Sequence, residues 1–212
     1  MKIDRAGYPF IAAAAVPAAG FVAARRYGLA ASFALLGGFF AYFFRDPERS
    51  VPQAPGLIVS PADGRVIVAG PSDPATSPPG QWQHIAIFLS PLDVHINRSP
   101  AAGRVTRIEY KPGRFLPAYD KQAGENEANE VWLDANGKPV VFRQVVGVLA
   151  RRIVCRIEEG QEVERGERVG LMKFGSRMDV FLPLDAELLV TVGQPVVAGE
   201  TVLAVLRSDD AA

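Results

Sequence analysis

The hydrophobic pattern divides the chain into two parts of different character. Residues 8–24 and 28–44 carry no charged side chain, and Arg25 and Arg45 mark the ends of these two runs. Each run is about as long as the shortest helix that crosses a bilayer, roughly 17 residues. The pattern predicts an apolar helical hairpin that associates with a membrane, with the second run, rich in Phe, as the stronger span. A cleaved signal peptide and a pair of buried helices are the alternatives.

Arginines flank both ends of the second run, so the distribution of positive charge assigns no orientation to the hairpin. A re-entrant or interfacial hairpin fits the sequence as well as two full spans. Residues 45–56 are polar and rich in Pro, which is typical of a linker. We therefore expect a membrane-associated hairpin with its linker at 1–50 and a second domain at 51–212.

From residue 57 onward, short apolar runs alternate with turn signals. The runs that predict strands are 57–60, 65–69, 84–89, 104–110, 130–133, 139–146, 151–157, 168–173, 178–182, 187–192 and 201–206. Many short strands at this spacing are typical of a sandwich or a barrel. The sequence predicts a mainly β fold, with a barrel-sandwich-like domain following the helical hairpin.

Two internal repeats support this β architecture. Residues 160–169 and 193–202 both read G-Q-x-V-x-x-G-E-x-V, a turn followed by a strand. Residues 60–66 (SPADGRV) and 99–105 (SPAAGRV) differ only in Asp63 against Ala102. If both segments form the same turn, the turn does not need the aspartate, and Asp63 becomes a candidate for chemistry.

Composition and the absence of several motifs argue against some classes of function. Lys and Arg together number 23, as do Asp and Glu, so no net basic field attracts nucleic acid. The one cysteine, Cys155, excludes an intramolecular disulfide. Two histidines and one cysteine far apart form no recognisable metal set, and no G-x-G-x-x-G or Walker motif occurs.

The segment 170–183, GLMKFGSRMDVFLP, reads as strand on both sides of a Gly175-Ser176 break. Glycine weakens a strand and often marks a close approach of the backbone. A serine needs a base to become a nucleophile. His95 lies in a polar stretch and is the better candidate, whereas we expect His84 to be a partly exposed strand residue. The sequence also permits a membrane-anchored serine hydrolase, although the G-x-S-x-G elbow is missing.

Five motifs follow the apolar hairpin in order: FFRDPER (43–49), SPADGRV (60–66), IFLSPLDVHINRSP (87–100), ENEANE (125–130) and KFGSRMDVFLP (173–183). Together they resemble phosphatidylserine decarboxylases of the short bacterial and archaeal form. Each motif alone is weak, but the ordered set spans nearly the whole chain and is specific.

The resemblance implies a pyruvoyl-dependent decarboxylase that converts phosphatidylserine in the bilayer to phosphatidylethanolamine and CO₂. It implies that the Ser176 hydroxyl attacks the Gly175 carbonyl, and that β-elimination then releases a large β chain, 1–175. Ser176 becomes the covalently bound pyruvoyl cofactor at the head of a small α chain, 176–212. We expect a heterodimer of these chains at the cell membrane, with the catalytic domain on the cytoplasmic side; a higher oligomer stays open.

By the same resemblance, His95 serves the decarboxylation step and Asp63 serves self-cleavage. The long bacterial forms carry a second histidine three residues after the first, and here that place is Arg98. Either His95 serves both steps or another group is the base for cleavage. Arg98 is instead a candidate for binding the substrate phosphate or carboxylate, because a guanidinium binds either in a bidentate manner.

The alternative reading is a carrier domain. GERVGLMKFGS resembles the hairpin that presents the modified lysine of biotinyl and lipoyl domains, with Lys173 in the lysine position. A carrier domain accounts for neither the apolar hairpin nor SPLDVHINRSP. On the decarboxylase reading, apolar residues of the loop 114–119, such as Phe115 and Leu116, are expected to enter the lipid head-group region.

Overall fold

The computed structural model describes residues 2–148, 152–173 and 176–207. The chain divides into two compact units, Met1–Glu48 and Arg49–Ala212. The helical elements are η1 (Arg5–Gly7), α1 (Tyr8–Ala23), α2 (Tyr27–Phe43) and η2 (Lys121–Glu125). The mainly β class with an N-terminal helical pair is confirmed.

The first unit is an antiparallel helical hairpin with a two-stranded sheet, β1 (Lys2–Ile3) and β2 (Arg45–Asp46), at its base. Phe10 packs against Phe40, and Phe21 against Phe33, along the hairpin. Most apolar side chains of α1 and α2 are nevertheless exposed. The longest apolar helical stretch is the first, with 19 residues, whereas α2, which the sequence favoured as the span, has 17.

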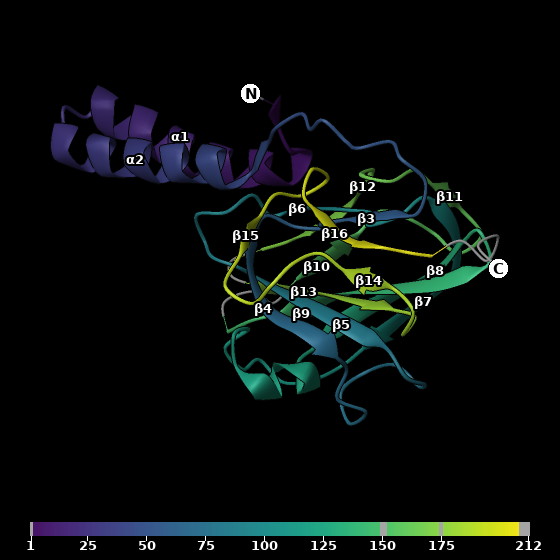
Figure 1. Ribbon diagram of the computed structural model, residues 1–212. Coiled ribbons are helices and arrows are strands. Elements are labelled where there is room, and N and C mark those ends of the chain that lie inside the picture. Colours follow the sequence, from purple (N-terminus) through teal and green to yellow (C-terminus); the bar gives the residue numbers. More distant parts are fainter. Residues whose placement is uncertain (1, 149–151, 174–175, 208–212) are drawn as a thin grey trace. The chain divides into compact units, whose positions relative to one another are not determined.

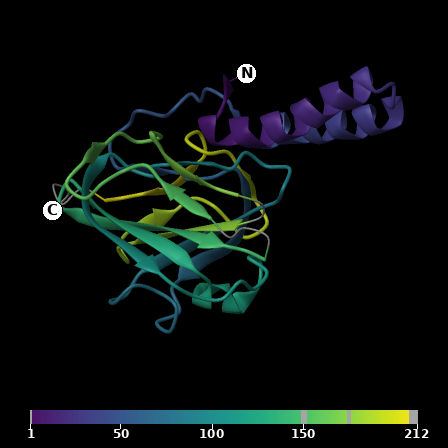
Figure 2. The same cartoon turned by 180° about the vertical axis from the view of Figure 1, so that it is seen from behind.

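The second unit is built on one curled sheet and two small sheets, drawn from opposite sides in Figures 1 and 2. In spatial order the large sheet contains β11 (Glu162–Val163), β7 (Gly103–Lys111), β8 (Ala128–Ala135), β9 (Lys138–Val146), β13 (Ser176–Leu182), β5 (Gln83–Leu89), β4 (Gly64–Pro71) and β15 (Pro195–Val196). The small sheets are β10 (Ile153–Cys155), β12 (Arg168–Met172) and β6 (Ile96–Arg98), and β14 (Glu187–Leu188), β16 (Val202–Val205) and β3 (Leu57–Val59).

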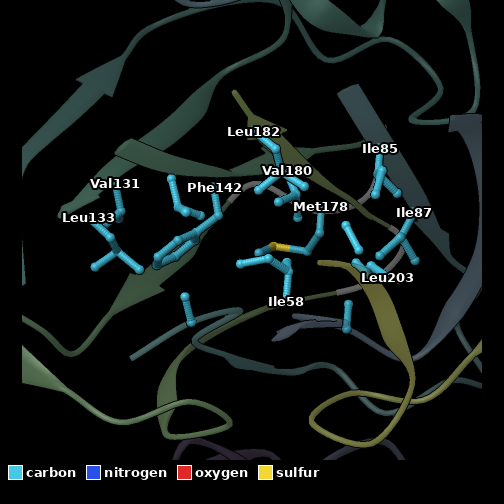
Figure 3. Packing of buried hydrophobic residues seen from close by; sticks show 14 of the residues in the cluster. Ile58, Ile85, Ile87, Val131, Leu133, Phe142, Met178, Val180, Leu182 and Leu203 are labelled. Carbon is cyan, nitrogen blue, oxygen red and sulfur yellow. The ribbon is translucent and has the colours of Figure 1, made fainter. Parts of the chain in front are cut away.

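The core lies between the large sheet and the small sheets. Side chains alternate between the two faces of a strand, so Met178 and Val180 of β13 point to the interior together. In Figure 3 they meet Ile58 of β3 and Phe142 of β9 in one apolar cluster. All four side chains are almost completely buried. Side chains that point from β13 into this layer are therefore shielded from water.

The two sequence repeats form one structural repeat. Pro195 of β15 pairs with Arg65, and Glu162 of β11 pairs with Arg104, at the same place in each motif. The backbone hydrogen bonds are also equivalent: the Gly193 N–H donates to the Val66 carbonyl at 2.8 Å, and the Gly160 N–H donates to the Val105 carbonyl at 2.7 Å. These matched registers show that the SPADGRV and SPAAGRV segments are equivalent turns.

Glycine is required at one position of both turns. A Cβ on Gly64 would lie 2.1 Å from the Phe88 carbonyl oxygen, and one on Gly103 would lie 2.3 Å from that of Asp134. Each turn therefore passes directly against the neighbouring strand. The strands β6, β11 and β15 were not predicted from sequence, because each has only two or three residues and follows turn signals.

Candidate active site

Ser176 is the first residue of the central strand β13. It stands opposite Leu89 of β5 on one side and Val146 of β9 on the other. The residue is completely buried, and within the described parts of the chain its hydroxyl has no hydrogen-bond partner. Gly175, the other half of the expected cleavage bond, lies outside the described residues.

The Ser176 side chain shares the interior face of β13 with Met178, by the alternation of the strand. A buried hydroxyl without a partner costs on the order of 1–3 kcal/mol. Such a group in a native fold needs a reason, and reactivity is one of the recognised reasons. The position therefore suits a nucleophile better than it suits a structural serine.

His95 lies immediately before β6 and is buried. Its Nδ1 is 3.0 Å from the Asp93 carbonyl oxygen. Because a carbonyl only accepts, Nδ1 carries the proton of the neutral ring and Nε2 is the basic nitrogen. The His95 carbonyl accepts from the N–H of Met172, the last residue of β12, at 3.4 Å. His95 is thereby held beside the segment that leads into Ser176.

Three buried amides lie on the interior face close to this point. Asn129 Nδ2 donates to Gln144 Oε1 at 3.2 Å, and Gln144 Nε2 donates to Asn97 Oδ1 at 2.9 Å. All three residues are at most 5% exposed. Sequence reasoning missed this chain of amides, although polar residues inside otherwise apolar strands were a signal for it.

Asp63 precedes β4 at the same end of the large sheet as Ser176. Its Oδ1 accepts from the Ala198 N–H at 2.8 Å, and Arg49 binds the carboxylate at 2.7 and 2.9 Å. Burial raises the pKa of Asp63, and this outweighs the opposing effects of the Ala198 N–H and Arg49. The Asp93 carboxylate adds to the upward shift, which places Asp63 near the segment that carries His95.

The equivalent turn in the other half contains Ala102 and forms the same backbone contacts. Ser60 and Ser99 donate their hydroxyls to the carbonyls two residues ahead, at 2.6 and 2.7 Å. The turn thus forms without a carboxylate at this position. The contrast that made Asp63 a candidate in the sequence is present in the fold, and the role of Asp63 stays a prediction.

Arg98 is buried, and its Nη1 donates to the Gly166 carbonyl at 2.8 Å. Its own N–H donates to the Pro61 carbonyl, so Arg98 joins the two equivalent halves. This contact is to the backbone of the protein itself. Binding of substrate by Arg98 stays a prediction.

His84 lies in strand β5, as expected, but the expectation that it is partly exposed was wrong. The residue is only 6% exposed, its ring stacks on Phe181 at 4.5 Å, and Nε2 lies 3.2 Å from Asp179 Oδ1. Arg177 donates to the same carboxylate at 2.6 Å. Burial alone would raise the pKa of Asp179, but Arg177 and His84 outweigh it and hold the pKa well below its usual range. These residues lie on the opposite face of β13 from Ser176.

A metal centre was not expected from the sequence. Among residues 2–148, 152–173 and 176–207, no three His, Cys, Asp or Glu side chains gather as metal ligands would. In this part of the β unit the described residues include the Ser176 hydroxyl, the His95 imidazole, the Asp63 carboxylate and the three buried amides. Such a set suits nucleophilic attack, proton transfer and stabilisation of negative charge.

The chain is similar to known proteins over nearly its full length. The phosphatidylserine decarboxylase family matches residues 36–204. A phosphatidylserine decarboxylase proenzyme of Oleidesulfovibrio alaskensis is 46% identical, covering 99% of this chain and 97% of the relative. Proteins of the same name from Desulfotalea psychrophila and Burkholderia multivorans are 45% and 44% identical, over 96% and 97% of this chain and 96% of each relative.

These similarities extend across the helical hairpin, both halves of the β unit and the strand that begins at Ser176. The alternative of a biotinyl or lipoyl carrier domain has no support from them. Full coverage at this identity decides membership: the chain belongs to the phosphatidylserine decarboxylase family of carboxy-lyases.

Proposed function

We propose that this chain is a proenzyme that cuts itself between Gly175 and Ser176 and then decarboxylates phosphatidylserine through a pyruvoyl group made from Ser176. The observation that carries the proposal is the buried Ser176 hydroxyl, without a partner among the described residues, at the head of the central strand. The names of the relatives, which call them proenzymes, support processing.

Maturation begins when the Ser176 oxygen bonds to the carbonyl carbon of Gly175 and the hydroxyl proton passes to a base. The C–N bond then breaks, the nitrogen takes a proton, and an ester replaces the amide. Loss of the Ser176 α-proton and cleavage of its Cβ–O bond release residues 1–175 as a carboxylic acid. The dehydroalanine that remains tautomerises to an imine, and water hydrolyses it to the pyruvoyl group with release of ammonia.

The two products remain associated because the strands on either side of the cut are held independently. β13 begins at Ser176 and pairs along its length with β5 and β9, which belong to the larger product. Met178, Val180 and Leu182 of the smaller product are fully buried in the shared core. Burial of each such side chain contributes roughly 1.5–3 kcal/mol, so a heterodimer of the cleaved chains is expected to be stable.

A pyruvoyl group at Ser176 would supply a ketone, which is the electron sink that loss of CO₂ from an amino acid head group needs. The described residues fit such a group, because Ser176 is buried and the polar side chains of the same part of the fold include the His95 imidazole and buried amides. His95 is proposed to hold and return a proton at Nε2, with Nδ1 anchored on the Asp93 carbonyl. Burial of His95 keeps water from competing for that proton.

The apolar hairpin is proposed to hold the enzyme at the cell membrane, with the β unit on the cytoplasmic side. α2 carries an exposed apolar stripe that includes Leu35, Phe39 and Tyr42. Contiguous exposed apolar patches commonly mark contacts with lipid or with another protein. Phosphatidylserine is itself a bilayer component, so an enzyme acting on it needs contact with the interface.

Exposed apolar residues also gather at the end of the large sheet that carries Ser176. Leu92 follows β5, Val148 follows β9, and Phe115 and Tyr119 lie in the loop between β7 and β8. They are 64%, 50%, 39% and 66% exposed, respectively. We call these four residues the rim. We propose that the rim enters the bilayer surface and so brings a lipid head group toward the end of the sheet that carries Ser176.

The test of this function is phosphatidylethanolamine formation from phosphatidylserine vesicles. The wild-type chain should produce it, treatment with borohydride should abolish it by reducing the ketone, and Ser176→Ala should be inactive. Ser90→Ala, a serine outside the central strand, is the matched control and should remain active. An active Ser176→Ala protein, or activity insensitive to borohydride, would overturn the proposal.

A further inference from the structure

The segment that leads into β3 takes a fixed path within the second unit. Residues 49–54, which we call the strap, form neither helix nor strand, yet they are bound to distant residues. The Ser50 N–H donates to Glu200 Oε1 at 3.0 Å. The Ala54 carbonyl accepts from Arg165 Nη1 at 2.7 Å. A segment that only connected two units would not need these contacts.

Between these two contacts the strap crosses the internal repeat. The repeated G-Q-x-V-x-x-G-E-x-V segments place Gly166 and Gly199 at equivalent positions, with φ of 77° and 76°. Their N–H groups donate to the equivalent carbonyls of Ser99 and Ser60, both at 2.8 Å. A Cβ on Gly166 would lie 2.4 Å from Val51 Cγ2, and one on Gly199 would lie 3.7 Å from the same atom. Val51 therefore lies between the two halves of the repeat.

The two halves differ in their contact with the strap at the position of Asp63 and Ala102. Ala102 is exposed, whereas the Asp63 side chain is 16% exposed and pairs with Arg49, whose side chain is 13% exposed. Water screens a pair shielded to this degree less than it screens a surface pair. Arg49 is also the one charged residue among residues 49–54. The strap thus directs its charge at the residue that distinguishes the two halves.

Arg49 limits the orientations that the Asp63 carboxylate can adopt. The Ala198 N–H donates to Oδ1 at 2.8 Å, and Arg49 Nη2 donates to Oδ1 at 2.9 Å and to Oδ2 at 2.7 Å. Rotation about the bond to a carboxylate has broad minima, so donors on both oxygens are needed to fix the group. The Arg49 side chain is itself confined, because a Cβ on Gly199 would lie 3.6 Å from the Cβ of Arg49.

We propose that Arg49 is a positioning residue of self-cleavage: held in place by the strap, its guanidinium keeps the Asp63 carboxylate in the orientation in which that carboxylate acts. Arg49 itself transfers no proton and acts only through Asp63. The inference rests on the proposed function and on the expected role of Asp63 in self-cleavage.

The contacts of the strap join distant parts of the sequence, so they form only when the β unit has folded. Asp63 and Gly166 belong to the larger cleavage product, whereas Gly199 and Glu200 belong to the smaller one. Arg49 therefore reaches Asp63 on this path only after residues on both sides of the cut have assembled. This dependence delays cleavage until the two products are able to remain associated.

The test measures the rate of precursor cleavage, by denaturing gel and intact mass, in freshly synthesised full-length protein. Arg49→Gln should cleave about 10–10²-fold more slowly, since a small misplacement of a catalytic group can cost up to about 10²-fold. Arg49→Lys keeps the charge without the planar guanidinium and should recover part of the rate. Cleavage of folded Arg49→Gln at the wild-type rate would overturn the inference.

Two glycine variants test whether the strap must be in place. Gly166→Ala puts a Cβ against Val51, and adding Val51→Ala removes the methyl groups that it meets. Gly160→Ala is the matched control, because Gly160 has a similar φ of 86° but its Cβ would meet only Arg104 Nη2, at 3.9 Å. Both variants carry the same kind of backbone strain.

Gly166→Ala should cleave more slowly than Gly160→Ala at a temperature where both are folded. Val51→Ala should restore part of the rate in the Gly166→Ala chain, because it lets the strap return to its path. Equal rates in the two glycine variants would mean that the place of the strap does not matter for cleavage, and would overturn the inference.

A double-mutant cycle gives a readout that a merely structural role would not move. If Arg49 acts through Asp63, Arg49→Gln should slow the wild-type chain and change nothing further in an Asp63→Asn chain. Where Asp63→Asn leaves no cleavage to measure, the glycine variants decide. Additive losses in chains with the same melting temperature would overturn the inference, as would a wild-type rate in Asp63→Asn. A wild-type chain that never cleaves would instead refute the proposed function itself.

Discussion

The N–H of Met172 donates to the carbonyl oxygen of His95 at 3.4 Å, and Met172 is the last residue of β12. This hydrogen bond ties the histidine to the strand that leads into Ser176. The imidazole is oriented independently, through Nδ1 and the Asp93 carbonyl. Backbone and ring are therefore both fixed, as expected for a residue that moves a proton at one defined atom.

Replacing His95 by Gln should reduce decarboxylation per mature subunit by about 10²–10⁴-fold, the usual contribution of a positioned acid or base. The measurement is phosphatidylethanolamine formed per pyruvoyl group. His84→Gln is the matched control, because His84 lies on the other face of the sheet and contacts Asp179. Full turnover by mature His95→Gln enzyme would remove His95 from the mechanism.

Self-cleavage should depend on Asp63 in its ionised form, so Asp63→Asn should slow it. The ionised fraction falls as the pH drops through the pKa of Asp63. Burial raises this pKa above its usual value, and Arg49 opposes the rise only in part. Arg49→Gln removes a lowering influence, so the pKa should rise further. The acidic decline of the cleavage rate should then begin at a higher pH than in the wild type.

Cleavage rates of the precursor between about pH 3 and pH 8 would show this shift, since the range includes the ordinary pKa of Asp and values well above it. Arg65→Gln is the control, because Arg65 donates to the Gly193 carbonyl and pairs with no carboxylate among residues 2–148, 152–173 and 176–207. An acidic decline at the same pH in Arg49→Gln and wild type would mean that Asp63 does not control the rate.

Asp179→Asn should destabilise the fold by about 3–5 kcal/mol at neutral pH, because it leaves the buried Arg177 without its charged partner. The pKa of Asp179 is depressed in the fold, so its stabilisation exists above the unfolded pKa of about 4 and is lost as the pH falls below it. The difference between wild type and variant should therefore shrink in acid.

Urea unfolding at pH 7 and below pH 4 would measure this, in a Ser176→Ala background that keeps the chain in one piece. Asp185→Asn is the surface control, since the pair of Asp185 with Lys138 is half exposed on the carboxylate side. Equal free energies of unfolding for Asp179→Asn and Asp185→Asn at pH 7 would show that the buried pair contributes nothing.

Substituting the rim residues Phe115 and Tyr119 by Ser should lower the rate on phosphatidylserine vesicles and spare the rate on a soluble short-chain analogue. Exposed apolar side chains aid binding only where there is an interface to enter. Leu184→Ser is the control, because Leu184 is 50% exposed and lies beyond the opposite end of β13. If both substrates were affected equally, the rim would not be a membrane contact.

Much of the fold was predictable because its strands are short apolar runs between strong turn signals. The contrast of Asp63 with Ala102 was visible because the sequence repeat places the two residues at equivalent positions. The burial of His84 was not, because it depends on Phe181 and Asp179 in a strand almost a hundred residues away. Asn97 was missed because its contact with Gln144 crosses the core between residues 47 positions apart in the sequence.

The central claim is tested most directly by the intact mass of the purified protein under denaturing conditions. The account predicts two chains, one ending at Gly175 and one beginning at residue 176 with a pyruvoyl group in place of serine. A single unmodified chain that nevertheless converts phosphatidylserine to phosphatidylethanolamine would contradict it.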